Sequence, residues 1–260
     1  MSEAQPVLVS IEGRVGVLEL ARPEKFNAMT ERAIEIIGQA LGEFEANQDV
    51  RAILIRAQGR NFCTGDDLDE IDSFGSDGDQ AGESSLRGHR LLQRLEASHL
   101  PVVAAVQGLA LAGGLEFMLA ADVVFLAENA RIGDQHAQFG LIPGWGGTQR
   151  LPRIIGMRRA LDLMFSARWI DSATAMEWGL ANYVLPDDDL QSAAMEYCIQ
   201  LGTRNGEGIA LMKRLAREGM DLPISQALDS ERLEIPAFLQ SANVAEGVAA
   251  FMQKRKPEFL

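Results

Sequence analysis

The chain has 260 residues and a formal net charge of −13, from 24 Lys and Arg against 37 Asp and Glu. This length is enough for one large hydrophobic core, and the acidic charge argues against nucleic acid as a main partner. The two cysteines, Cys63 and Cys198, show no CxxC spacing, and the chain begins without a basic segment followed by an apolar one, so we expect a cytoplasmic protein without a disulfide framework.

The first part of the chain alternates strand and helix patterns. Residues 7–11 and 15–20 are β-rich runs on either side of a Glu-Gly-Arg turn, which predicts a hairpin. Thr30 is a good N-cap for a helix whose apolar stripe consists of Ile34, Ile37, Leu41 and Phe44. Residues 52–55 predict a short buried strand, so the order is strand, strand, helix, strand.

The rest of the chain is expected to be mostly helical. Residues 73–85 are rich in Gly, Ser and Asp and show no periodicity, which predicts a mobile loop. A helix is expected over 86–97 and a buried strand over 101–106. The apolar region 100–127 is interrupted by polar residues and glycines, so no membrane span is expected. The later patterns predict helices over 157–165 and 172–180, a strand over 182–185, and helices over 190–201, 208–218, 225–238 and 245–253.

The residues most suggestive of chemistry follow the strand at 101–106. Gly113 and Gly114 turn the chain, and residues 115–121 predict a short buried helix. Because Gly113 lacks a Cβ atom, its backbone N–H can approach a ligand closely, and the helix that follows favours negative charge there. Glu116 is the one ionisable side chain in this apolar window. The alternative is that Glu116 only complements the helix dipole.

Several motifs occur in an order that is typical of one enzyme family. They are Phe62-Cys63-x-Gly65-x-Asp67-Leu68, Gly113-Gly114-x-Glu116 followed by Ala121-Asp122, and Ile142-Pro143-Gly144-x-Gly146-Gly147-Thr148-Gln149-Arg150-Leu151. Together they resemble the crotonase superfamily, the enoyl-CoA hydratases and isomerases. The resemblance covers almost the whole chain. It implies an α/β fold, with a crotonase-type spiral of ββα units over residues 1–195 and a helical C-terminal trimerisation region over 196–260.

The resemblance also implies a homotrimer or a dimer of trimers, although the C-terminal helices could equally cover the core within one subunit. The implied substrate is an acyl-CoA thioester, with coenzyme A as part of the substrate and no metal or prosthetic group. The backbone N–H groups of Asp66 and Gly113 are implied to hold the thioester oxygen, and Glu116 to act as general acid or base.

The second catalytic glutamate of the hydratases is replaced here by His136. An imidazole can also transfer a proton near neutral pH, so the substitution is compatible with hydration. The alternative for His136 is a packed or hydrogen-bonded loop residue. Asp134, in the same loop, and His89, on the helix expected at 86–97, are further candidates whose participation is left open.

Further site residues are implied by the same resemblance. Those expected to bind coenzyme A are Arg22, Lys25, Ala28, Gly65, Asp67, Leu68, Lys254 and Lys256. Those expected to line the substrate pocket are Phe139, Pro143, Gly144 and Trp145. The alternatives are solvated surface charges for the cations and core packing for the aromatic rings. Asp69 is an acid where relatives often carry a lysine that helps to hold coenzyme A.

The leading hypothesis is an acyl-CoA lyase of the enoyl-CoA hydratase type, which adds water to a 2-enoyl-CoA thioester, or removes it, through an oxyanion-stabilised enolate. Because the second glutamate is missing, an enoyl-CoA isomerase or acyl-CoA hydrolase that uses Glu116 alone is the alternative. From other classes, a non-catalytic acyl-CoA binder and an RNA-binding relative of the hydratases are also considered, and the acidic charge argues against the latter.

Overall fold

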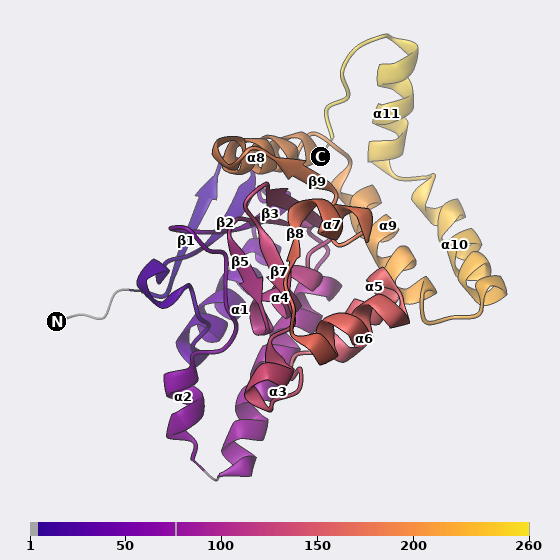
Figure 1. Cartoon of the computed structure of the whole chain (residues 1–260). Helices are drawn as coiled ribbons and strands as arrows, with labels where there is room; N and C mark the ends of the chain where they lie inside the picture. The colour runs from indigo at the N-terminus through magenta and orange to yellow at the C-terminus, as the bar shows by residue number, and fades with distance from the viewer. Residues whose placement is uncertain (1–4, 76, 260) are drawn as a thin grey trace.

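Two β-sheets form the body of the molecule in the computed structural model, which describes residues 5–75 and 77–259 (Figure 1). The main sheet has the order β1-β2-β3-β4-β6-β9. Its strands are β1 (Val7–Glu12), β2 (Val15–Leu20), β3 (Ala52–Ala57), β4 (Val102–Val106), β6 (Val123–Ala127) and β9 (Tyr183–Leu185). β1 and β2 pair antiparallel around a turn with Gly13 at a φ of 63°, which confirms the predicted hairpin. The pairs from β2 to β9 are parallel.

The second sheet consists of β5 (Leu109–Leu111), β7 (Arg131–Gly133) and β8 (Ile170–Asp171). The chain passes from β4 in the main sheet to β5 in the second sheet and then into α4 (Gly113–Leu119), and it passes in the same way from β6 to β7. This repeated step produces the expected course of two strands and a helix in successive turns. The strands of the second sheet are two or three residues long, too short to give a periodic signal in the sequence.

α1 (Glu31–Ala46) begins where the capping pattern predicts. The Oγ1 atom of Thr30 accepts a hydrogen bond from the N–H of Ala33 at 3.1 Å. The predicted apolar stripe is buried and belongs to the larger hydrophobic core, together with alternate residues of β2, β3 and β4. Burying one such side chain contributes about 1.5–3 kcal/mol. α1 therefore covers one face of the main sheet.

The segment 73–85 is largely helical, and the predicted loop is wrong there. α2 (Leu68–Ser73) ends at its start, and α3 (Gly78–Ala97) begins only a few residues later. The carboxylate of Asp77 accepts hydrogen bonds from two N–H groups in the first turn of α3, at 3.0 and 3.1 Å. This cap, together with the buried leucines in the second half of α3, offsets the low helix propensity of the Gly and Ser residues.

The remaining helices of the body are α5 (Gly147–Ile155), α6 (Met157–Ser166), α7 (Ser172–Glu177) and α8 (Leu190–Leu201). α8 lies across the main sheet on the face opposite α1 (Figure 1). Its buried residues Leu190, Ala194 and Cys198 pack against strand residues that alternate with those facing α1. The predicted boundary between residues 195 and 196 falls inside this helix. The body of the molecule extends to the end of α8.

Three C-terminal helices, α9 (Gly206–Gly219), α10 (Ile224–Phe238) and α11 (Ala242–Met252), follow the body. α9 is bonded to it, since Nζ of Lys213 donates to the carbonyl of Leu95 at 3.1 Å, and α10 and α11 extend away from it (Figure 1). Their positions agree with the predicted ranges to within a few residues. Large apolar side chains are exposed along them, including Met220, Ile224, Leu228, Leu233, Leu239 and Phe251. Across the described residues, no helix combines the length and the apolar character needed to cross a membrane.

Candidate active site

The turn between β5 and α4 brings two loops into close contact. A Cβ atom on Gly114 would lie 2.1 Å from the carbonyl oxygen of Cys63, so only glycine fits at this position. Gly113 is the first residue of α4, and its N–H therefore has no acceptor within the helix. Gly113 also lines a cavity of about 460 Å³. This amide thus lies at the cavity wall with its hydrogen-bonding capacity unused by α4.

The loop before α2 reaches the same cavity. The N–H of Met29 donates to the carbonyl of Gly65, and the N–H of Asp67 donates to the carbonyl of Met29, both at 2.8 Å. In such a parallel bridge the N–H of the central residue, Asp66, points away from Met29. A Cβ atom on Gly65 would lie 3.0 Å from the amide nitrogen of Gly113. Asp66 and Gly113, predicted to supply two amides to one ligand, are therefore brought together at the cavity wall.

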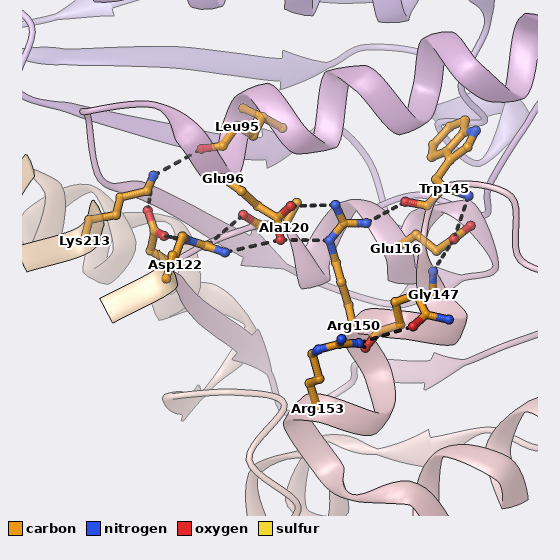
Figure 2. A network of polar contacts seen from close by, with 12 residues as sticks. Leu95, Glu96, Glu116, Ala120, Asp122, Trp145, Gly147, Arg150, Arg153 and Lys213 are labelled. Carbon is orange, nitrogen blue, oxygen red and sulfur yellow. Dashed lines mark hydrogen bonds and ion pairs between the residues drawn. The ribbon is translucent and has the colours of Figure 1, made fainter. Parts of the chain in front are cut away.

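Glu116 lies one helical turn after Gly113 and is 1% exposed. Its Oε1 atom accepts hydrogen bonds from the N–H groups of Trp145, at 2.8 Å, and Gly147, at 2.6 Å (Figure 2). Burial raises the pKa of Glu116, and the two amides and His136 oppose that shift only in part. A carboxyl group that is buried, oriented and harder to ionise than usual is suited to proton transfer.

His136 connects Glu116 to the cavity. It lines the cavity, and its Nε2 atom is 3.7 Å from Oε2 of Glu116. Its Nδ1 atom lies 2.9 Å from Oδ1 of Asp134, which also accepts the N–H of His136 at 3.2 Å. Burial alone would lower the pKa of His136, but the hydrogen bond and charge of Asp134, together with Glu116 and Asp66, raise it. Asp134 thus orients the imidazole, and Nε2 faces Glu116.

The carboxyl group of Asp66 is a part of the site that the sequence motif does not reveal, because the motif predicts a role only for the backbone amide. Asp66 lines the same cavity as His136. Burial, followed by the charge of Glu116, raises the pKa of the Asp66 carboxyl to about 7. The cavity therefore contains an acid that changes protonation near neutral pH. The sequence does contain one signal of this acid: the residue whose backbone amide is predicted to bind the ligand is itself an aspartate.

The residues predicted to hold coenzyme A divide into two groups. Lys25 and Ala28 line the cavity, and Nζ of Lys25 is 2.8 Å from Oδ2 of Asp69, with both side chains exposed. The hydrogen bond to Asp69 raises the pKa of Lys25. Arg22 is not part of the cavity wall. Its Nη1 atom is 2.8 Å from Oδ2 of Asp67 and donates to the carbonyl of Ala28 at 2.9 Å, so it ties two loops of the site together.

The predicted pocket residues are only partly at the cavity. Phe139 lines it, as does Leu68 from the coenzyme A group, and both side chains are largely exposed. Trp145 is 2% exposed and belongs to the core, which corrects its assignment to the pocket. A Cβ atom on Gly88 would lie 2.2 Å from Nε1 of Trp145, so α3 and the indole ring pack in close contact. Pro143 and Gly144, beside Trp145, likewise lie outside the residues that line the cavity.

Three other candidates lie away from these residues. Lys254 and Lys256 follow α11 and are not among the residues that line the cavity of His136. Their assignment to coenzyme A therefore receives no support from the arrangement within one chain. His89 lines another cavity, of about 1040 Å³, between α3, α5 and α9. The structure separates His89 from the cavity that His136 lines.

Comparison with known proteins identifies the family of the chain. Residues 10–260 match the family model described as enoyl-CoA hydratase/isomerase. A probable enoyl-CoA hydratase of Mycobacterium bovis is 32% identical over 256 residues, covering 98% of each chain. The 1,2-epoxyphenylacetyl-CoA isomerase of Escherichia coli is 31% identical over 255 residues, covering 97% of each chain.

Solved structures give the same result. The crystal structure of an enoyl-CoA hydratase from Bacillus anthracis matches with a TM-score of 0.94 at 29% identity, covering 98% of this chain and 99% of that chain. The expected crotonase-type α/β fold is therefore confirmed. From the motifs, the fold and these relatives together, the chain belongs to the enoyl-CoA hydratase/isomerase family.

Proposed function

We propose that the chain is an enoyl-CoA hydratase, which adds water to a 2-enoyl-CoA thioester or removes it in the reverse reaction. The observation that carries this proposal is the position of Glu116. Its carboxyl group is buried, held by two amides, and lies one helical turn from the Gly113 amide at the cavity wall. An acid–base group and a pair of oxyanion donors are what enolate chemistry requires.

In the proposed reaction, the thioester oxygen accepts hydrogen bonds from the N–H groups of Asp66 and Gly113. Water attacks Cβ of the substrate while Glu116 accepts a proton from it, and the π electrons move to the thioester oxygen to form an enolate. A proton then goes to Cα, and the thioester carbonyl is restored. Each amide donor contributes about 2.7–4 kcal/mol to the stabilisation of such an oxyanion.

The second proton in this proposal moves through His136. His136 lines the cavity and its Nε2 atom is 3.7 Å from Oε2 of Glu116, so in this proposal it relays a proton between substrate and carboxylate. The raised pKa of His136 favours the protonated form that donates. Asp66, with a pKa of about 7, provides another proton source in the same cavity. Lys25 at the cavity wall is proposed to face the phosphates of coenzyme A, in competition with Asp69.

An enoyl-CoA isomerase is the second candidate, and one observation favours it. An imidazole, His136, lies beside Glu116 where a hydratase has its second glutamate, and isomerisation requires proton removal and return by a single base. A relative at 31% identity is an isomerase of an epoxidised acyl-CoA. In this reaction Glu116 would remove a proton from one carbon of a 3-enoyl-CoA and return it to another.

Turnover assays distinguish the two reactions. The purified protein is incubated with a panel of 2-enoyl-CoA and 3-enoyl-CoA thioesters in D₂O, and products are identified by mass spectrometry. A hydratase yields hydroxyacyl-CoA, heavier by one D₂O, whereas an isomerase yields an enoyl-CoA that has gained no water and whose double bond has moved. If coenzyme A esters bind but none is converted, the proposed function is wrong and a binding protein is the better description.

We further propose that α9, α10 and α11 assemble the chain as a homotrimer or a dimer of trimers. The support is the set of large apolar side chains exposed along these helices. In such an assembly Lys254 and Lys256, which lie after α11, would approach coenzyme A bound to a neighbouring copy. Multi-angle light scattering at micromolar protein measures the assembly mass, and the mass of a single chain would contradict the proposal.

A further inference from the structure

The orientation of the Glu116 carboxylate depends on residues 145–147, a short segment of another loop. The N–H groups of Trp145 and Gly147 both bond to Oε1 of Glu116, and the residue between them, Gly146, has a φ of 106°. Only glycine adopts this conformation readily. Two amides from alternate residues, 145 and 147, can bond to one oxygen only while the backbone at 145–147 keeps this one conformation. A shift of this backbone segment would therefore also shift the carboxylate of Glu116.

Arg150, on α5, holds the segment from the side opposite Glu116. Its Nη1 atom donates to the carbonyl oxygen of Trp145 at 2.5 Å (Figure 2). A Cβ atom on Gly146 would lie 2.3 Å from the same Nη1 atom, so the guanidinium group and the segment are in direct contact. Trp145 thus accepts from Arg150 through its carbonyl and donates to Glu116 through its amide. Arg150 lines the larger cavity and does not line the cavity of His136.

Arg150 is in turn held by the carboxylate of Glu96. Its Nε and Nη2 atoms donate to the two carboxylate oxygens of Glu96 on α3, at 2.8 and 2.5 Å. Glu96 also accepts from Arg217 of α9 at 3.2 Å, and Arg217 pairs with Asp122 at 2.7 Å. Lys213 of α9 pairs with the other oxygen of Asp122, also at 2.7 Å. Figure 2 shows this connected series of contacts between Lys213 and Glu116.

A two-pronged contact between a guanidinium and a carboxylate fixes the plane of the arginine, which a single contact does not. The Arg150–Glu96 pair is largely buried, so it is less screened than a surface pair. The orientation of Nη1 toward Trp145 is therefore set by Glu96. The contacts of Arg217 and Asp122 extend the support from the active-site loop to the first C-terminal helix.

We propose that Arg150, clamped by Glu96, is a positioning residue for Glu116. It acts through the backbone at 145–147 and touches neither substrate nor Glu116 itself. This inference rests on the proposed function of Glu116 as the acid–base group. It assigns a role to the final arginine of the Gly146-Gly147-Thr148-Gln149-Arg150 motif.

The experiment compares Arg150→Lys and Glu96→Gln with the wild type over a range of pH. Lysine cannot bond to both Glu96 oxygens and the Trp145 carbonyl with the same geometry, and glutamine removes the charge that holds the guanidinium. Both variants are expected to lower kcat by about 10- to 100-fold, since small misplacements of a catalytic group have effects of this size. KM should change little because Arg150 lies outside the substrate cavity.

The pH profile separates positioning from a merely structural role. Hydrogen bonds from Trp145 and Gly147 favour the ionised form of Glu116. When the segment loosens, the pKa of Glu116 rises, and the acid limb of kcat/KM should move up by about one pH unit. The other charged groups near Glu116, namely His136, Asp66 and Asp134, are unchanged in these variants. A kcat and a pH profile equal to those of the wild type in both variants would overturn the proposal.

Arg153→Gln is the matched control. Arg153 lies on the same helix, three residues beyond Arg150, and its Nη1 atom donates to Gln149 at 2.9 Å, outside the series of contacts to Glu116 (Figure 2). This variant should keep the wild-type kcat and pH profile. If Arg150→Lys does not fold, Glu96→Gln alone decides, because it is nearly isosteric.

A second readout does not depend on turnover. Carbon-13 NMR titration of the Glu116 carboxyl, assigned with Glu116→Gln, should show a raised pKa in Glu96→Gln even without substrate. If the wild type converts no enoyl-CoA, the proposed function fails, yet this titration still tests the positioning role. An unchanged titration of Glu116 would then refute it.

Discussion

Replacing Glu116 with glutamine separates the chemical role of the carboxylate from its structural role. In the native site Oε1 accepts the N–H groups of Trp145 and Gly147 at 2.8 and 2.6 Å. The amide oxygen of glutamine can accept the same two bonds, which forces its NH₂ group toward His136. The geometry of the 145–147 segment is thus retained, while the group can no longer take up a proton at neutral pH.

The expected magnitudes follow from this geometry. General acid–base catalysis contributes about 10²- to 10⁴-fold, so Glu116→Gln should lower kcat by that factor, or about 3–5 kcal/mol in activation free energy. Its stability should stay near that of the wild type, because both buried N–H groups keep an acceptor. Glu116→Ala removes that acceptor. At about 1–3 kcal/mol for each unsatisfied group, alanine should lower the free energy of unfolding by about 2–6 kcal/mol.

Urea unfolding measures the stability, and steady-state kinetics the kcat, of the wild type, Glu116→Gln and Glu116→Ala. We expect the glutamine variant to be stable and inactive and the alanine variant to be unstable and inactive. If glutamine destabilises the protein as much as alanine does, the two amides are not holding a carboxylate oxygen. If glutamine retains full turnover, Glu116 is not the acid–base group.

Three further predictions test the acids and the tight turn of the site. Asp66 has a pKa raised from 3.8 to about 7, so the folded protein gains a proton there and loses stability as pH rises from about 4 to 7, by up to about 4 kcal/mol. Asp66→Asn should therefore raise the free energy of unfolding at pH 8 more than at pH 4, measured in urea. Asp134→Asn removes the charge that raises the pKa of His136, so the NMR titration of His136 should shift to lower pH. Gly114→Ala places a Cβ atom 2.1 Å from the carbonyl of Cys63 and should destabilise the fold by about 1–3 kcal/mol, read from urea unfolding.

The elements that the sequence predicted correctly are those with a strong local pattern. The hairpin of β1 and β2, the capped helix after Thr30, and the C-terminal helices each carry periodicity or capping residues over six or more positions. β6 and the strands of the second sheet were not predicted. Only residues 120–122 separate the buried α4 from β6, too few to mark a change of period in so apolar a stretch.

The site was predictable where function depends on the backbone and less so where it depends on side-chain packing. Gly114 marks a close approach of two segments of the chain, because a Cβ atom there would lie 2.1 Å from the carbonyl oxygen of Cys63. The sequence around Trp145 gives no comparable signal, because a ring beside an active-site loop can face either a ligand or the core. In the structure the ring packs against Gly88, 57 positions earlier in the chain, and is buried in the core. The partners of Arg22 and Lys25 were equally hidden, since both pair with acids more than forty residues away.

The charges around His136 determine which carboxyl group of the cavity holds a proton. Asp134 and Glu116 flank one imidazole, and Asp66 adds a third carboxyl group within interaction range. Burying three carboxylates beside a single cation is unfavourable, because each ionised group pays a desolvation cost and repels the others. The lowest cost is reached when one acid holds a proton, and the carboxyl with a pKa of about 7 is that of Asp66. A neutral Asp66 carries both its amide and an acidic O–H at the cavity wall, so the cavity contains a proton donor in addition to His136.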